Sequence, residues 1–388
     1  MISTLQKQER IQVSRLTTLP EIDSLRDEWR QLEERCPDIT PFSTWEWCDA
    51  VAQHFGDGRP LQVFTFRDNG ELLGIAPFAE TPVSGLRFLR LLGSGFGHYS
   101  IADYQDLLLA EGHEDEVIGA LCDVLAQHPT WDALHLQELP ASSRVSPRLI
   151  SAAASRGWRP VIRSDSDVHL LAIDGSWDTY KATLSRSTRN DGRRLTRKLI
   201  EEYDASFGSG GDDEEAVRKA MEELFDLHTR RWRAVGKPGI FRDQRRRDFH
   251  REVARRFAQR RMLRLYLLRS GDETIAINYG FQSDGTTYLY ALGSNPDPRW
   301  QRFRLGLVLD LNLIEDAFQQ GARCVDFMRG DGHYKSHFRT GTDFNQDLLV
   351  FRNRRVELQY RMTRAAGGAF GRLRRRLADG GGQATKAD

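Results

Sequence analysis

Three residues that can donate or transfer protons follow a short apolar run near the end of the chain. The run, residues 324–328, is long enough for one buried strand, and residues 329–332 after it contain two glycines. Glycines allow a sharp turn and a close approach of a ligand to the backbone. His333, Tyr334 and Lys335 come next. Because ligands of open α/β sheets bind at strand ends, we expect chemistry at this turn.

Composition and charge narrow the class of protein. The 388 residues are 39% apolar with a net charge of +1, which predicts two or three domains and no overall electrostatic attraction to nucleic acid or membranes. Arginines are nevertheless concentrated in residues 186–198, 242–264 and 352–376. The four cysteines follow no metal-ligand spacing, so we expect reduced thiols and no metal site. Without a signal peptide or a membrane-length apolar run, we expect a cytoplasmic protein.

The elements that must position the turn occur twice. Residues 61–75 align without a gap on residues 263–277, and each hairpin is followed by a third strand, a helix and a further strand. This repeated order indicates a duplicated domain. Two short strands, near residues 158–162 and 168–173, are expected to close the first half. In the second half the order predicts a long apolar helix, 305–320, directly before the strand that leads to the turn.

This order of elements resembles the GNAT acyltransferase superfamily, and two such units resemble its FemAB-like branch, above all the cellulose-biosynthesis-protein-D-like acetyltransferases. The stretches that carry the resemblance are residues 29–33, 41–47, 74–78, 185–189, 225–232, 276–281 and 326–335. The resemblance implies a mixed α/β fold of two tandem GNAT-like domains that share a central cleft, with a C-terminal basic helix. The expected division is an N-terminal domain at 10–175, a catalytic domain at 176–355, and the basic helix with its tail at 356–388.

The resemblance also implies a binding site for acetyl-CoA or another acyl-CoA. In the GNAT pattern, the pyrophosphate binds backbone N–H groups where the helix after the meander begins, as expected for an anion at a helix N-terminus. The GNAT signature at this place has two small residues, and this chain supplies only one glycine. Arg302 and Arg304, which lie just before this helix, are therefore expected to bind the phosphate groups directly. The predicted cofactor-binding residues are Arg302, Arg304, Leu305, Gly306 and Leu307.

Acyl transfer to an amine requires the amine to be neutral. An amine of pKa ~10 is neutral in about one molecule per thousand at pH 7, which costs about 4 kcal/mol unless a base assists. Asp331 is the first candidate base; Asp326 is the second, with the alternative that it satisfies backbone donors at the strand end. Tyr334 matches the tyrosine acid of many GNAT enzymes. Lys335 matches the family's Tyr-Lys pair, which implies binding of the developing oxyanion or of a substrate phosphate.

Five residues are expected to bind the acceptor. Arg231 and Trp232 resemble the family's Arg-Trp pair, although Trp232 is equally expected to serve packing. Tyr290 faces either a cleft or the core. Arg189 suits an anionic substrate or a solvated basic face, and Arg329 completes the set at the strand end.

The predicted function is transfer of an acyl group, foremost acetyl, from acyl-CoA to a small-molecule or peptide amine by direct attack. One alternative is aminoacyl transfer from charged tRNA, as in the Fem enzymes, because the basic stretches 242–264 and 352–376 would suit tRNA. A second alternative is a non-catalytic binding module that the arginine-rich tail recruits to anionic membrane surfaces.

Overall fold

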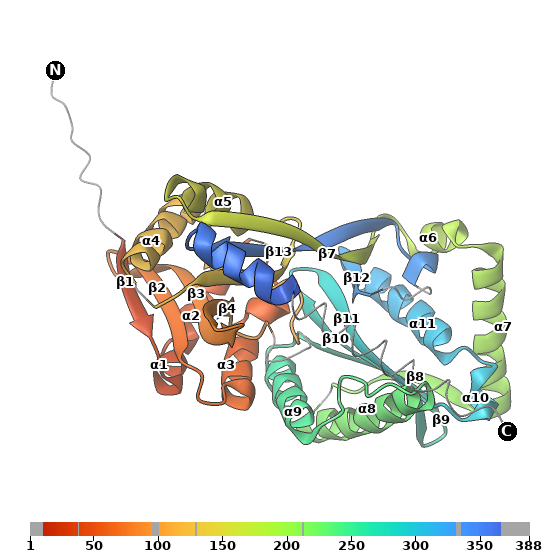
Figure 1. Cartoon of the computed structure of the whole chain (residues 1–388). Helices are drawn as coiled ribbons and strands as arrows, with labels where there is room; N and C mark the ends of the chain where they lie inside the picture. Colours follow the sequence, from red (N-terminus) through yellow and green to blue (C-terminus); the bar gives the residue numbers. More distant parts are fainter. Residues whose placement is uncertain are drawn as a thin grey trace, which may run out of the picture.

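The computed structural model describes residues 11–37, 39–94, 101–128, 130–211, 213–330 and 335–365, without the side chains of residues 164 and 165. Within these residues, 13 strands form one continuous mixed sheet that runs through both halves of the molecule (Figure 1). Helices cover both faces of the sheet. The structure is therefore a mixed α/β fold, as predicted from the sequence.

The first half begins with an edge strand and two short helices, and a hairpin then enters the sheet. Asn69 and Gly70, both at positive φ, make the tight turn of this hairpin. Thr44 caps the third helix by accepting a hydrogen bond from the backbone N–H of Trp47. The elements of this half are β1 (Gln12–Leu16), α1 (Leu19–Ser24), α2 (Arg26–Glu33), η1 (Pro41–Ser43), α3 (Trp45–Phe55), β2 (Leu61–Asp68), β3 (Glu71–Val83), β4 (Leu86–Leu91), β5 (Leu108–Leu109), α4 (Glu114–Gln127), β6 (Ala133–Pro140), α5 (Val145–Ser155) and β7 (Arg159–Ala172).

The second half repeats this order after an insertion of four helices and one strand. Asp213 and Asp243 cap two of these helices through their carboxylates. The elements are α6 (Trp177–Thr183), α7 (Arg186–Tyr203), β8 (Ala205–Ser209), α8 (Glu214–Ala234), α9 (Gln244–Gln259), β9 (Leu263–Ser270), β10 (Glu273–Ser283), β11 (Thr286–Ser294), α10 (Pro298–Gln301), α11 (Leu305–Gln319), β12 (Cys324–Arg329), η2 (Lys335–His337) and β13 (Gly341–Phe351). Residues 354–365 are helical.

The strand pairing confirms the duplication. In each half an antiparallel three-stranded meander is followed by a helix and by a strand parallel to the third: β4 pairs with β6, and β11 pairs with β12. The two strands predicted near 158–162 and 168–173 are instead one strand, β7, because the extended pairing with β13 continues from Arg159 through Leu170. Propensity within the strand does not reveal this long-range partner.

The last strand of each half completes the sheet of the other half. β7, from the first half, pairs with β12 of the second, and β13, from the end of the second half, pairs with β6 of the first. β7 and β13 also pair with each other, and Figure 1 shows them running together across the top of the molecule. We call this arrangement the strand exchange. It joins the two halves through main-chain hydrogen bonds.

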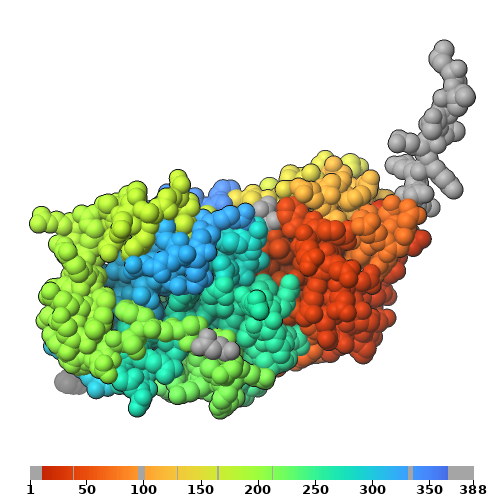
Figure 2. Space-filling view, turned by 180° about the vertical axis from the view of Figure 1, so that it is seen from behind, coloured from red at the N-terminus to blue at the C-terminus, as the bar shows by residue number. Residues whose placement is uncertain are grey.

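Side chains of α9 join the halves a second time. The Arg256 guanidinium contacts the buried carboxylate of Asp49 at 2.8 Å, and Arg260 contacts Glu33 and Glu46 at 2.7 Å each. In Figure 2 the red N-terminal helices lie directly against this green-to-teal part of the second half. Helices α8 and α9 cover one face of the second half's strands, and α7 and α11 cover the other. In the part of the chain that the structure describes, no helix has the length and apolar character needed to cross a membrane.

Candidate active site

Strands β11 and β12 diverge in the middle of the sheet. They pair in parallel over Thr286–Tyr288 and Cys324–Asp326, whereas β11 runs on to Ser294 and β12 to Arg329. We call the diverging ends, residues 289–294 and 327–329, the strand opening. Side chains from both faces of the sheet can meet at such a gap. The gap lies at the carboxyl ends of two parallel strands, and ligands of α/β sheets bind at such ends.

A backbone bulge shapes the β12 side of the opening. Met328 has φ 58°, a left-handed conformation that costs a non-glycine residue roughly 1–3 kcal/mol. The Asp326 carboxylate compensates: its Oδ1 accepts hydrogen bonds from the Met328 backbone N–H at 2.6 Å and from the Tyr104 hydroxyl at 3.0 Å. Burial raises the pKa of Asp326 to about 7. The buried carboxyl thus holds the bulge and keeps its proton to a higher pH than an exposed aspartate does.

Lys335 fixes a positive charge at the end of β12. Its Nζ donates to the carbonyl oxygen of Met328 at 2.9 Å and to that of Arg329 at 2.7 Å. The side chain is buried. An ammonium held by two carbonyls needs little reorganisation to stabilise negative charge that develops nearby. The structure therefore places this predicted catalytic residue at the strand opening.

Helix α11 begins beside the opening, and its first backbone N–H groups have no acceptor among the described residues. Its N-cap residue, Arg304, has φ 48° and provides no side-chain cap. The first N–H groups, at Leu305, Gly306 and Leu307, therefore remain available to an anion. A Cβ at residue 306 would lie 3.2 Å from Cδ2 of Leu292, so glycine keeps the helix start close to β11. These backbone groups fit the pyrophosphate of an acyl-CoA.

The two arginines predicted to bind phosphate already have protein partners. Arg302 donates to the hydroxyl of Tyr203 at 2.5 Å, and Arg304 forms an ion pair with Asp191 at 3.0 Å. Both partners lie on α7. Phosphate binding by either arginine would require it to exchange that partner.

Asp310 also belongs to the strand opening, although it is not among the site residues predicted from the sequence. It lies in the second turn of α11 and is 2% exposed, and its Oδ2 has no hydrogen-bond partner among the described residues. Burial raises the pKa of Asp310 to about 7, and the positive charges of Arg231 and Lys335 oppose this rise. The sequence signal is one acidic residue within the apolar stripe of the helix, at a position where packing would favour leucine.

The predicted acceptor-binding residues are spread over several places. Arg231 lies at the opening, where its guanidinium donates to the Leu292 carbonyl oxygen at 3.3 Å. Trp232 packs beside His228 with ring centroids 5.8 Å apart. Tyr290 donates to the Ile101 carbonyl oxygen at 2.9 Å, inside an aromatic cluster between the halves.

The other two predicted binding residues make structural contacts. Arg189 donates to the carbonyl oxygens of Ala182 and Leu184, where it fixes the junction of α6 and α7. Arg329 forms ion pairs with Asp103 and Glu138 of the first half. Two further predicted catalytic residues, Asp331 and Tyr334, lie outside the described residues, so their roles stay predictions.

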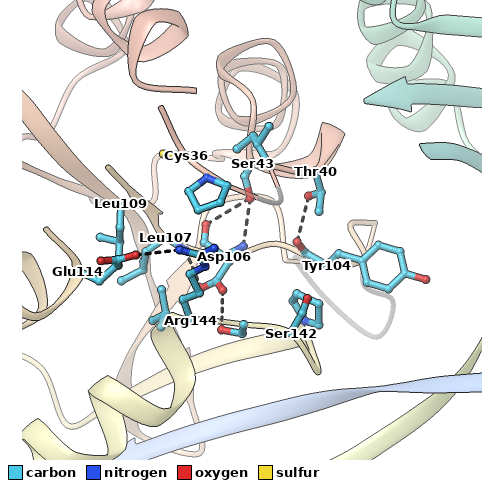
Figure 3. A pocket seen from close by; sticks show the side chains of 15 residues that line it. Cys36, Thr40, Ser43, Tyr104, Asp106, Leu107, Leu109, Glu114, Ser142 and Arg144 are labelled. Atoms are coloured by element: carbon cyan, nitrogen blue, oxygen red, sulfur yellow. Dashed lines mark hydrogen bonds and ion pairs between the residues drawn. The ribbon is translucent and has the colours of Figure 1, made fainter. Parts of the chain in front are cut away.

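Two cavities adjoin at Thr40 and Tyr104; first-half residues alone line the smaller one, and both halves line the larger one. The smaller, of about 50 Å³, has room for water rather than for a substrate. In it the Asp106 carboxylate accepts hydrogen bonds from the Ser143 hydroxyl at 2.5 Å and from the Leu107 N–H, and burial raises the pKa of Asp106 to about 7. Figure 3 shows the Tyr104 ring directed away from Asp106. Tyr104 reaches instead toward the larger cavity, of about 370 Å³, which Asp326 also lines.

Comparisons with known proteins agree with this geometry. Residues 186–336 match the model of an acetyltransferase (GNAT) domain. No curated protein sequence matches the chain significantly. The matched residues 186–336 contain the elements from α7 to β12, including the strand opening and the start of α11. The family match and the local geometry therefore concern the same part of the chain.

Solved structures resemble the whole chain. FemX superposes with a TM-score of 0.56 at 12% identity, covering 87% of this chain and 96% of FemX. A conserved protein of unknown function from Bacteroides thetaiotaomicron gives 0.55 at 9% identity, covering 88% and 99%. L-PGS from Bacillus licheniformis gives 0.52 at 10% identity, covering 86% and 96%. At such identities the likeness concerns the fold. The chain thus has the FemAB-like GNAT fold, with two GNAT-like units in one sheet, and residues 186–336 of its second unit match the GNAT domain model.

Proposed function

We propose that the chain is an N-acyltransferase that moves an acyl group, foremost acetyl, from acyl-CoA to an amine by direct attack. The observation that carries the proposal is the strand opening beside the uncapped start of α11. There, the first N–H groups of α11 lie beside an opening that holds the buried side chains of Lys335 and Asp310, and Asp326 lies on the strand β12 that leads to this opening. A nucleotide-linked thioester needs both an anion site and a polar reaction centre, and this part of the sheet offers both.

Each group has a defined part in the proposed reaction. The N–H groups of residues 305–307 bind the pyrophosphate. The Lys335 ammonium stabilises the negative charge that develops on the acyl oxygen, a contribution of about 3–4 kcal/mol for one such donor in other enzymes. Asp326 removes the proton of the amine, because a base whose pKa is near 7 is well matched to neutral pH. Tyr334 remains the proposed acid for the leaving thiolate.

The arrangement of the basic stretches bears on the alternative donor, charged tRNA. The fold of FemX is compatible with that alternative. However, seven of the ten arginines of residues 242–264 form ion pairs with protein carboxylates. Among them, Arg256 and Arg260 bridge to the first half, and Arg251 pairs with Glu222. Phosphate contacts by these side chains would have to replace existing ion pairs, so the acyl-CoA donor is the simpler proposal.

Ligand-induced stabilisation of the full chain tests the donor. Acetyl-CoA at one hundred times its Kd adds about 2.7 kcal/mol to the free energy of unfolding, which we expect to raise the Tm by roughly 3 °C in a chain of this size. Gly306→Val should abolish most of this rise because a side chain there crowds Leu292 at the helix start. The matched control is Gly119→Val, since a Cβ at residue 119 meets nothing within 4 Å.

The outcomes separate the two donors. A Tm that acetyl-CoA leaves unchanged would contradict the proposal. Binding of charged tRNA with a steep salt dependence, together with an unchanged Tm in acetyl-CoA, would favour aminoacyl transfer instead.

A further inference from the structure

The larger cavity lies on the face of β12 opposite α11. Successive strand residues point to opposite faces of a sheet. Val325 and Phe327 pack in the same core cluster as α11, whereas Met328 belongs to the cluster with α8 and α9. Asp326 therefore points away from α11, into the cavity of about 370 Å³ that it lines between the halves. This volume lies in the range of small-molecule sites.

Carboxylates dominate the charge of this cavity. Asp326, Asp343 and Asp284 line it, against one cation, Arg323, which is paired with Asp284. Asp343 forms no ion pair within the described part of the chain. Among the described residues, its carboxylate accepts one hydrogen bond, from the backbone N–H of the adjacent residue 344 to Oδ1 at 2.8 Å. An anionic ligand would meet net repulsion in this cavity, whereas a cation would be attracted.

One carboxylate oxygen of Asp326 has no hydrogen-bond donor among the described residues. Asp326 is 5% exposed, and both of its hydrogen bonds, from Met328 and Tyr104, go to Oδ1. For Oδ2 the described residues supply no hydrogen bond. Because Asp326 lines the cavity, this oxygen is open to accept a hydrogen bond from water or from the donor of a ligand.

The remaining walls suit an aliphatic chain. Val168 and Leu170 of β7 contribute apolar surface. The rings of Tyr104 and Tyr288 lie with centroids 6.0 Å apart on the wall nearest Asp326. Aromatic faces attract ammonium groups and also pack against methylene groups. The cavity thus combines an anionic end with an apolar body.

We propose that this cavity binds the acceptor substrate, and that the acceptor is a cationic primary amine on a short aliphatic chain, with its ammonium directed at Asp326 and Asp343. This inference rests on the proposed function. It names the class of acceptor and excludes anionic acceptors such as nucleotides or acidic peptides.

Asp326 links this cavity to the strand opening. The residue whose N–H it binds, Met328, offers its carbonyl oxygen to Lys335 on the opening side. The ammonium transfers one proton to the Asp326 carboxylate, which releases it to solvent. The neutral nitrogen then forms a bond to the acyl carbon, the carbon–sulfur bond breaks, and the acid of the proposed function protonates the departing thiolate and takes the second proton from nitrogen in return. The products are an amide and free CoA.

Calorimetric titration of the full chain without acyl donor tests the acceptor class. The probes are cadaverine, its neutral analogue pentanediol and the dianion glutarate. We expect cadaverine alone to bind. Asp343→Asn should weaken cadaverine binding about five-fold, the size of effect expected for a half-exposed charge pair. Asp272→Asn, at an exposed turn between β9 and β10, is the matched control and should leave cadaverine binding unchanged.

The results overturn or support the inference independently of the donor. Equal binding of pentanediol or glutarate, or an Asp343→Asn variant that binds cadaverine as wild type does, would overturn it. Acetyl-CoA binding is measured on the same samples. If acetyl-CoA binds and cadaverine does not, the inference fails while the proposed function stands. If cadaverine binds and acetyl-CoA does not, the amine cavity is supported and the proposed donor fails.

Discussion

Replacing Asp310 by asparagine should stabilise the protein at pH 8. Asparagine has nearly the same shape as aspartate and carries no charge. Asp310 is 2% exposed, and its Oδ2 has no hydrogen-bond partner within the described residues. An ionised carboxylate in such a place loses its hydration without full compensation. The variant therefore removes a charge whose burial opposes folding, and the protein should become more resistant to denaturant.

The magnitude follows from the proton affinity of the carboxyl. Burial raises the pKa of Asp310 from 3.8 to about 7, and a tenfold change in proton affinity is worth about 1.4 kcal/mol. The native state thus holds a proton between about pH 4 and pH 7 that the unfolded state has lost. Stability falls as pH rises through this window, by up to about 4 kcal/mol, and is constant above it. The Asp310→Asn variant does not lose this stability, because asparagine does not titrate.

Urea unfolding of both proteins from pH 4 to pH 8 measures the effect. We expect the variant to exceed wild type by up to about 4 kcal/mol at pH 8, with the difference vanishing near pH 4. Glu315→Gln, further along α11 and half-buried, is the control and should change the free energy of unfolding by less than about 0.5 kcal/mol. A difference that does not vary with pH, or a variant less stable than wild type at pH 8, would refute the reasoning.

Three further outcomes are expected. Arg256→Ala should lower the free energy of unfolding by about 3–5 kcal/mol, because it leaves the buried carboxylate of Asp49 without its ion-pair partner. The control Arg245→Ala removes an exposed ion pair and should cost less than about 1 kcal/mol. Equal losses of the two variants in urea titrations would contradict this prediction. Lys335→Met should lower kcat of acyl transfer about 100-fold in steady-state assays, and an unchanged kcat would remove Lys335 from the mechanism. Because Asp326 acts as a base with a pKa of about 7, kcat/KM should rise with pH through about 7, and a flat profile would exclude that role.

The repeated architecture could be predicted because it rests on local patterns. Alternating apolar residues and the Asn69-Gly70 turn specify the first hairpin, and the same spacing recurs at residues 263–277. The strand exchange could not be predicted in this way. Which strand lies beside β6 depends on a partner about two hundred residues later in the chain, and strand propensity carries no information about such pairing.

Only part of the candidate site could be read from the sequence. Asp326 follows from its place at a strand end before a glycine turn, whereas Lys335, which comes after that turn, follows from the resemblance to the family's Tyr-Lys pair. The sequence does not show the tertiary partners of a residue: Arg329, which is predicted to bind substrate, forms ion pairs with Asp103 and Glu138 of the first half. Asp310 had a readable signal, an acid on an apolar helix face, although the sequence alone does not show what that acid approaches.

The strand exchange also sets the order in which the protein can be completed. A ribosome releases β6 long before β13, the strand that pairs with it, so the first half has an unpaired sheet edge until residue 351 has been synthesised. Exposed edges of this kind invite pairing with other chains. Had the two repeats been separate polypeptides, the same exchange would have made an intertwined dimer. Joined in one chain, the repeats exchange strands at fixed stoichiometry, and neither half has a complete sheet without the other.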